Sequence, residues 1–392
     1  YFKYYVISTF ILILSILFFF LKNKLKEKLI ISFGSLVFSF YFIEIIFQIS
    51  ENKKKTNMSR FDKNLMEEYK KDNPEFVTYI APSNFLSKKN KYLPFSGVSL
   101  KKTFLCDENG YLAQYRSDRY GFNNPDKNWD SKTEFLLLGD SFVHGACVNE
   151  KDTFRSQMEK LLRGKKFYNV ISLGYSGTGP LIQLATLKEY YSKVKPKTII
   201  WFYFEGNDIN DFIQENNNMI LKKYLNDQEF KQNLNNHQKL LDEKLLRYLK
   251  KEVTNKQMNI FRRSVENFIK LQLTRNFLEG FFYKRSGINQ IPNDYEKVLK
   301  NMIEFVEKNN SSLYFVYVPS KRRYINPKNN TSELFNYGKL IELVKSNNID
   351  LIDLNIDFFS KEKNPLNFYP AHRDGGHFNE FGYQKISKFL IN

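Results

Sequence analysis

The first motif that could do chemistry follows an apolar run of the chain. Gly139, Asp140 and Ser141 come directly after Phe135–Leu138, which has the composition of a buried strand. A serine at a strand-to-helix turn can act as a nucleophile, and its own backbone N–H can donate to a developing oxyanion. The alternative interpretation is that Ser141 only caps the helix that follows.

Two further motifs follow other apolar runs. The loop Ser172–Pro180 reads SLGYSGTGP, and its glycines let the backbone approach a ligand closely. Asn207 stands in the sequence Glu-Gly-Asn-Asp, and its carboxamide is a suitable hydrogen-bond donor for an oxyanion. Either motif alone is weak evidence, because glycine-rich loops and Gly-Asn turns are common.

The last motif places a histidine near the end of the chain. His377 precedes the amphipathic run Glu380–Ile391, and Asp374 stands three residues before it. Asp374 can accept the hydrogen of one imidazole nitrogen, so that the other nitrogen can take the Ser141 proton. The alternative is a structural capping histidine. We expect His144, three residues after Ser141, to pack rather than to line a pocket.

The elements that must position these residues alternate between apolar runs and helical patterns. The apolar runs are Phe135–Leu138, Tyr168–Leu173, Thr198–Tyr203, Leu313–Val318 and Leu351–Leu354. The helical patterns lie near Thr153–Leu162, Leu181–Val194, Asp294–Glu307 and Ser332–Ser346. This alternation predicts an α/β fold in which helices cover a parallel sheet. Ligands of such sheets bind at the carboxyl ends of the strands, where the motifs fall.

Taken together, the four ordered motifs resemble those of the SGNH hydrolases, also called GDSL-type esterases and lipases. The resemblance spans residues 135–392 and is interrupted by a helical insertion. It implies a flavodoxin-like three-layer α/β/α domain with Ser141 as nucleophile. It also implies that His377 is the general base and then the acid, and that Asp374 orients it.

The same resemblance implies an oxyanion hole and a reaction that needs no metal or cofactor. Its donors would be the backbone amides of Ser141 and Gly177 together with the side chain of Asn207. The predicted function is a serine esterase that hydrolyses an acyl group, O-acetyl or another short ester, on envelope carbohydrate or lipid. The alternatives are an O-acyltransferase with the same site and a non-catalytic envelope protein that binds or assembles glycans.

The amino-terminal segment predicts a transmembrane helical hairpin over residues 1–50. Tyr4–Leu21 contains no charge, and Leu29–Ile49 is apolar except for Glu44 and Gln48. Two buried core helices are a weak alternative, because neither run has a polar face. No small-residue cleavage site separates the runs, which argues against a simple cleaved signal.

The connecting loop KNKLKEK predicts which side of the membrane carries the rest of the chain. It holds four lysines and one glutamate, and such loops tend to stay in the cytoplasm. The catalytic domain would then be periplasmic or extracellular, although lysines at 53–55 argue the other way. We expect a linker and leading subdomain over 51–132, and the hydrolase domain over 133–392. The helical insertion at 209–291 is a lid, a membrane-facing flap or a solvated excursion.

Composition limits the partners and the metal chemistry. The net charge is +18, but the lysines are spread along the chain, so we expect no nucleic-acid partner. Attraction to anionic lipid or polysaccharide remains an alternative. The only cysteines, Cys106 and Cys147, cannot form a structural zinc site by themselves. They pair if the domain is exported and are otherwise ordinary buried thiols.

Overall fold

The computed structural model describes most of the chain, and the chain divides into two compact units. Residues 9, 12, 18–58, 73, 75–87, 91–163, 168–282, 291–325, 336–370 and 376–391 are described. One unit comprises Tyr1–Asn57 and Thr254–Arg285, and the other comprises Met58–Val253 and Ser286–Asn392.

The larger unit is organised around a five-stranded parallel sheet. Its strands are β4 (Thr133–Leu138), β5 (Asn169–Ser172), β6 (Thr198–Phe204), β7 (Ser312–Val318) and β8 (Asp350–Asp353). Their order across the sheet is β5-β4-β6-β7-β8, and every neighbouring pair is parallel. Counted along the chain this is 2-1-3-4-5, the flavodoxin-like order. Each of the five apolar runs overlaps one strand, so the predicted parallel sheet is confirmed.

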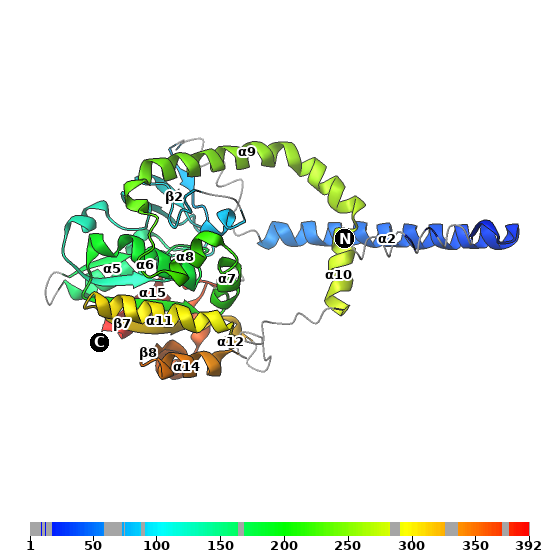
Figure 1. Ribbon diagram of the computed structural model, residues 1–392. Helices are drawn as coiled ribbons and strands as arrows, with labels where there is room; N and C mark the ends of the chain where they lie inside the picture. The colour runs from blue at the N-terminus through cyan, green and yellow to red at the C-terminus, as the bar shows by residue number, and fades with distance from the viewer. Residues whose placement is uncertain are drawn as a thin grey trace. The chain divides into compact units, whose positions relative to one another are not determined.

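Helices cover both faces of this sheet, because side chains along each strand alternate between two cores. Leu136 and Trp201 belong to one core with side chains of α6, α11 and α14, whereas Leu137 and Phe202 belong to the other with α5 and α15. These helices are α5 (Phe154–Leu162), α6 (Pro180–Val194), α11 (Asn293–Lys308), α14 (Tyr337–Ser346) and α15 (Glu380–Ile391) (Figure 1). The three-layer α/β/α expectation is therefore confirmed.

A second, small sheet lies in the segment before β4. Strands β1 (Val77–Thr78) and β2 (Lys102–Phe104) are parallel, and β3 (Gln114–Arg116) pairs with β2 in antiparallel orientation. The turn between β2 and β3 carries Cys106, which forms a disulfide with Cys147. The structure therefore confirms the alternative in which the two cysteines form a disulfide.

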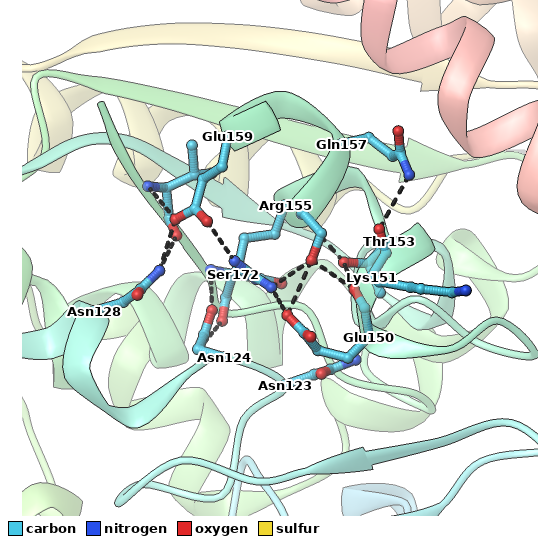
Figure 2. A network of polar contacts seen from close by, with 12 residues as sticks. Asn123, Asn124, Asn128, Glu150, Lys151, Thr153, Arg155, Gln157, Glu159 and Ser172 are labelled. Atoms are coloured by element: carbon cyan, nitrogen blue, oxygen red, sulfur yellow. Dashed lines mark hydrogen bonds and ion pairs between the residues drawn. The ribbon is translucent and has the colours of Figure 1, made fainter. Parts of the chain in front are cut away.

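A polar network fastens this leading segment to the large sheet. Asn124 accepts a hydrogen bond from the Ser172 N–H at 2.8 Å and donates one to the Ser172 carbonyl at 2.9 Å. Figure 2 shows Arg155 nearby, between Glu150 and Glu159. The Glu159 carboxylate lies 2.8 Å from the Arg155 guanidinium. Only 2% of the Arg155 side chain is exposed, and such a buried charge requires these partners. The network holds the end of β5, from which the glycine-rich loop departs.

The interval 209–291 contains helices and turns and, in its described part, no strand. Its helices are α7 (Asp208–Glu215), α8 (Met219–Asn226), η4 (Leu234–Asn236), α9 (Gln238–Ile269) and α10 (Gln272–Phe282). The other short helices are η1 (Pro82–Phe85), η2 (Asp126–Asp130), α4 (Ser141–His144), η3 (Glu150–Asp152), α12 (Arg322–Ile325), η5 (Leu354–Phe358), η6 (Phe359–Lys361) and η7 (Pro365–Phe368).

The smaller unit contains the long helix α2 (Asn23–Met58). Its portion Asn23–Ser50 is long and apolar enough to cross a bilayer, and only 6% of its most apolar window is buried. The other predicted span, Tyr4–Leu21, lies almost entirely outside the described residues. The expectation of a loop at KNKLKEK is wrong, because α2 begins at Asn23. Leucine, lysine and glutamate are good helix formers, which explains why the helix extends through this segment.

Candidate active site

Ser141 begins the one-turn helix α4 immediately after β4. Asp140 is the residue that caps this helix, since its Oδ1 accepts the Phe142 N–H at 2.9 Å. The helix ends at Gly145, whose φ of 79° is in the left-handed region that favours glycine. Ser141 is thus not the capping residue, and its Oγ lies 2.9 Å from Nε2 of His377.

Glu108 holds the other side of the His377 ring. Both carboxylate oxygens of Glu108 lie 3.0 Å from Nδ1 of His377, and Oε2 also accepts the His377 backbone N–H at 3.3 Å. The Glu108 residue is 2% exposed and His377 is 9% exposed. A carboxylate in this place selects the tautomer with hydrogen on Nδ1. The lone pair of Nε2 then faces the Ser141 hydroxyl and can accept its proton.

Glu108 was not among the residues that the sequence singled out. Asp374, the predicted partner of His377, lies outside the described residues, as does His372. Glu108 comes from the turn between β2 and β3, which the disulfide joins to Cys147. Cys147 Sγ itself lies 3.7 Å from Nδ1 of His377. The disulfide therefore fixes the turn that carries the carboxylate next to the imidazole.

Cys106, Glu108 and Cys147 form a cluster whose potential ligand atoms lie within 4.8 Å of one another. The donor chemistry does not suit a metal ion, because metal-binding cysteines coordinate as thiolates. Both sulfurs are joined in the disulfide, and the Glu108 carboxylate already accepts from His377. The cluster is better described as the support of the histidine.

One cavity of about 690 Å³ is lined by Ser141, Gly177, Asn207 and His377. These four predicted residues follow β4, β5 and β6 or precede α15, and the fold brings them to one place. Gly177 has a φ of 78°, and a Cβ there would lie 2.6 Å from Cβ of Ala81. Only glycine fits this position, so the backbone of the loop can come close to a bound group.

Asn207 is oriented by a neighbouring carboxylate. Its Nδ2 donates to Asp211 Oδ2 at 2.8 Å, which uses one of its two N–H groups. The Asn207 Oδ1 is buried and has no hydrogen-bond partner among the described residues. Burial, together with the nearby negative charge of Asp140, raises the pKa of Asp211 to about 7. Asp211 was not predicted from the sequence, although it stands one helical turn after Asn207.

His144 packs in the interior, as expected, and does not line the cavity. Its Nδ1 accepts the Ser176 backbone N–H at 3.1 Å, and its Nε2 lies 3.0 Å from the Tyr115 hydroxyl. Burial lowers the pKa of His144 to about 3, and the nearby charge of His377 adds to this. A neutral His144 therefore holds the backbone beside Gly177 throughout the physiological pH range.

The cavity has two different walls. Tyr79, Ala81, Leu105 and Cys106 belong to the leading segment and line one part of it. Ser320, Lys321 and Arg322 follow β7 and line another part. Buried Glu205 accepts the Ser320 N–H at 2.6 Å and pairs with Arg323, which fixes this second loop. A separate cavity of about 760 Å³, lined in part by Lys132 and Lys197, contains none of the candidate catalytic residues.

Comparison with known proteins gives likenesses to solved structures alone. No protein-family model matches the sequence, and no curated protein matches it. The lipase/acylhydrolase from Enterococcus faecalis is 12% identical with a TM-score of 0.36, covering 66% of this chain and 93% of that one. The acetyl xylan esterase AlAXEase is 16% identical with a TM-score of 0.37, covering 66% and 97%.

The psychrotrophic esterase EstA from Pseudoalteromonas sp. is 11% identical with a TM-score of 0.32, covering 67% of this chain and 100% of that one. At these identities and TM-scores, each of the three is a protein that this chain is similar to.

Proposed function

We propose that this chain is a membrane-anchored serine esterase of the SGNH type, with Ser141 as nucleophile and His377 as general base. The observation that carries the proposal is the hydrogen-bonded series Glu108, His377, Ser141, with distances of 3.0 Å and 2.9 Å. Ser141, the last residue of this series, lines a cavity that Gly177 and Asn207 also line. Carboxylate, imidazole and hydroxyl in this order form a catalytic triad, which is recognised by geometry and not by chain order.

In the first half of the reaction, Ser141 Oγ attacks the ester carbonyl while His377 Nε2 takes the hydroxyl proton. The tetrahedral intermediate then collapses, and the C–O bond to the alcohol breaks. His377 returns the proton to the leaving oxygen, which leaves the acyl group on Ser141. Glu108 accepts the Nδ1 hydrogen throughout and stabilises the imidazolium that forms.

In the second half, water attacks the acyl-serine, and His377 takes one of its protons. Collapse of the second tetrahedral intermediate breaks the bond to Ser141 Oγ, which regains the proton from His377. The carboxylic acid is released and the enzyme is restored. The oxyanion of both intermediates would be held by the backbone amides of Ser141 and Gly177 and the carboxamide of Asn207. One such donor is commonly worth about 3 to 4 kcal/mol of transition-state stabilisation.

The substrate that we propose is a short ester, such as O-acetyl, on envelope carbohydrate or lipid. Helix α2 would anchor the chain in a membrane, since its apolar side chains, including Phe33 and Phe38, are 68% and 72% exposed. The disulfide between Cys106 and Cys147 favours an oxidising compartment, periplasmic or extracellular. Under this proposal residues 1–50 form the membrane anchor, 51–132 the linker and leading subdomain, and 133–392 the hydrolase domain.

A fluorophosphonate probe tests the proposal directly, because it reacts with an activated serine. We expect labelling of the full-length protein, loss of labelling in Ser141→Ala, and hydrolysis of a short-chain nitrophenyl ester that disappears with it. Ser320→Ala is the matched control, since Ser320 lines the same cavity. Labelling that persists in Ser141→Ala, or a folded protein that cleaves no ester, would overturn the assignment.

A further inference from the structure

Helix α2 carries one acidic residue within its apolar part that is completely buried. Glu44 is 0% exposed, although its neighbours Ile43 and Ile45 are 37% and 43% exposed. An ionisable side chain in a membrane span is costly unless protein groups satisfy it. The surroundings of Glu44 therefore show what covers this side of the helix.

The partners of Glu44 are the first residues of α10. Its carboxylate accepts hydrogen bonds from the N–H groups of Leu273 at 3.1 Å and Thr274 at 2.8 Å, and from the Thr274 hydroxyl at 2.8 Å. N–H groups in the first turn of a helix have no partner within the helix, and a carboxylate there is favourable. Glu44 and the beginning of α10 thus satisfy each other away from water.

Two aromatic residues of α2 extend this contact on the same face, three positions before and after Glu44. The Tyr41 hydroxyl donates to the Ile269 carbonyl at 3.1 Å, and its ring lies 5.3 Å from that of Phe268. Phe47 lies 5.0 Å from Phe277, measured between ring centroids. The end of α9, the turn and α10, residues 265–282, are here called the elbow. The elbow therefore packs along one stripe of α2.

Several apolar side chains of the elbow stay exposed although it packs on α2. Val265, Ile269, Phe277 and Leu278 are 39%, 61%, 50% and 38% exposed. Phe277 contacts Phe47 of α2, and the nearby α2 residues Phe42 and Ile46 are 54% and 49% exposed. A contiguous apolar surface of this kind marks a membrane or protein contact.

We propose that the elbow is a membrane-inserted element that packs on α2 and places Ile269 and Leu278 among the lipid acyl chains. Continuity with the apolar surface of α2 favours the bilayer as the occupant. The exposed basic residues Lys270 and Arg275 also favour it, because such side chains reach toward lipid phosphates at the interface. The inference rests on the proposal that α2 spans the bilayer and is independent of ester hydrolysis.

Lipid contact can be measured with an environment-sensitive fluorophore on single cysteines. The two native cysteines are paired, so an added cysteine can be labelled selectively. Full-length Ile269→Cys and Leu278→Cys would carry the fluorophore in vesicles of phosphatidylethanolamine and phosphatidylglycerol with brominated acyl chains. Phe33→Cys on α2 reports the span, and Met219→Cys on α8, which is 75% exposed, reports water.

Quenching at 269 and 278 as strong as at 33, with none at 219, supports the inference. Quenching at 33 but not at 269 and 278 overturns it while leaving the anchor intact. Protection of 269 from aqueous iodide without quenching by lipid also overturns it, because a protein surface or a second copy would then cover the elbow. Absence of quenching at 33 overturns both the membrane anchor and the insertion of the elbow. Ester hydrolysis is measured separately, so its loss or retention is distinguished from these outcomes.

The role of Glu44 provides a second measurement. We expect Glu44→Ala to abolish the lipid quenching at 269 and 278 while quenching at 33 persists, because the first turn of α10 loses its acceptor. Gln48→Ala, one helical turn further along α2, is the matched control and should retain the quenching at all three positions. Unchanged quenching in Glu44→Ala would show that the elbow does not depend on this contact, against the inference.

Discussion

The candidate site has one wall from the loops of the large sheet and one from the leading segment, and these two walls are built in different ways. Ser141, Gly177 and Asn207 stand in loops that follow β4, β5 and β6, and the large cores on both faces of the sheet fix those strands. Glu108 stands in the turn of a small hairpin whose own cluster contains few side chains, including Tyr115 and both cysteines. The large sheet thus presents Ser141, whereas the leading segment supports His377.

This difference implies that the two walls can be perturbed separately. The sheet loops depend on a core that many residues share, so loss of one side chain there should change chemistry more than position. The Glu108 turn depends on the disulfide and on the bond from Asn109 Nδ2 to the Cys147 carbonyl at 2.8 Å. A change in these few contacts should move the carboxylate while leaving the sheet intact.

The largest effect is expected from the carboxylate itself. Glu108→Gln should lower kcat by roughly 10⁴-fold, because an amide favours the wrong imidazole tautomer. Asp374→Asn is the paired variant and should keep activity within a few-fold of wild type. Steady-state hydrolysis of a short ester measures both. The opposite ranking would assign the orienting role to Asp374, as the sequence first predicted.

Removal of the disulfide tests the wall that the leading segment forms. Replacing Cys106 and Cys147 together by alanine should lower the free energy of unfolding by about 4 kcal/mol in the chain-entropy treatment, because their separation is 41 residues. Ester hydrolysis should fall as well, since Glu108 is no longer held beside His377. Urea unfolding with and without a reductant measures the change in the free energy of unfolding. A reductant should weaken the wild type and leave the double variant unchanged.

Loss of the proposed oxyanion donor Asn207 should lower activity without lowering stability. Asn207→Ala should lower kcat by about 10²- to 10³-fold with little change in KM, because the donor acts mainly in the transition state. The thermal midpoint should stay close to that of the wild type. Asn217→Ala is a matched control on an exposed asparagine outside the cavity. A normal kcat in Asn207→Ala would remove this side chain from the mechanism.

Stability should also depend on pH through Asp211. Its pKa in the folded protein is about 7, above the ordinary value of 3.8, so the folded state holds a proton that the unfolded state releases. This contribution to stability is present below pH 3.8 and is lost as pH rises toward 7. Asp211→Asn should flatten the decline by at most about 1.4 kcal/mol per pH unit. Urea unfolding at several pH values measures the slope, and an unchanged slope would contradict the assignment.

Local pattern was sufficient for the sheet, its covering helices and the places of three site residues. Continuous apolar runs mark strands buried on both faces, and strands of a parallel sheet end at the same edge. For that reason Ser141, Gly177 and Asn207 could be expected near one another before any coordinates, and the resemblance of the motifs added His377. Their catalytic roles remain predictions. The pattern does not predict the helical start of α2, because a basic stretch between two apolar runs is typical of a loop.

The tertiary structure alone decided which carboxylate meets His377, that the cysteines pair, and that Glu44 meets α10. Glu108 is one of 42 acidic residues and lies 269 positions before the histidine, with no periodicity linking the two. Hydrophobic periodicity records which side of an element is buried, since that depends on neighbours one turn or two residues away. Which distant polar groups meet depends on the path of the whole chain, which no local pattern records.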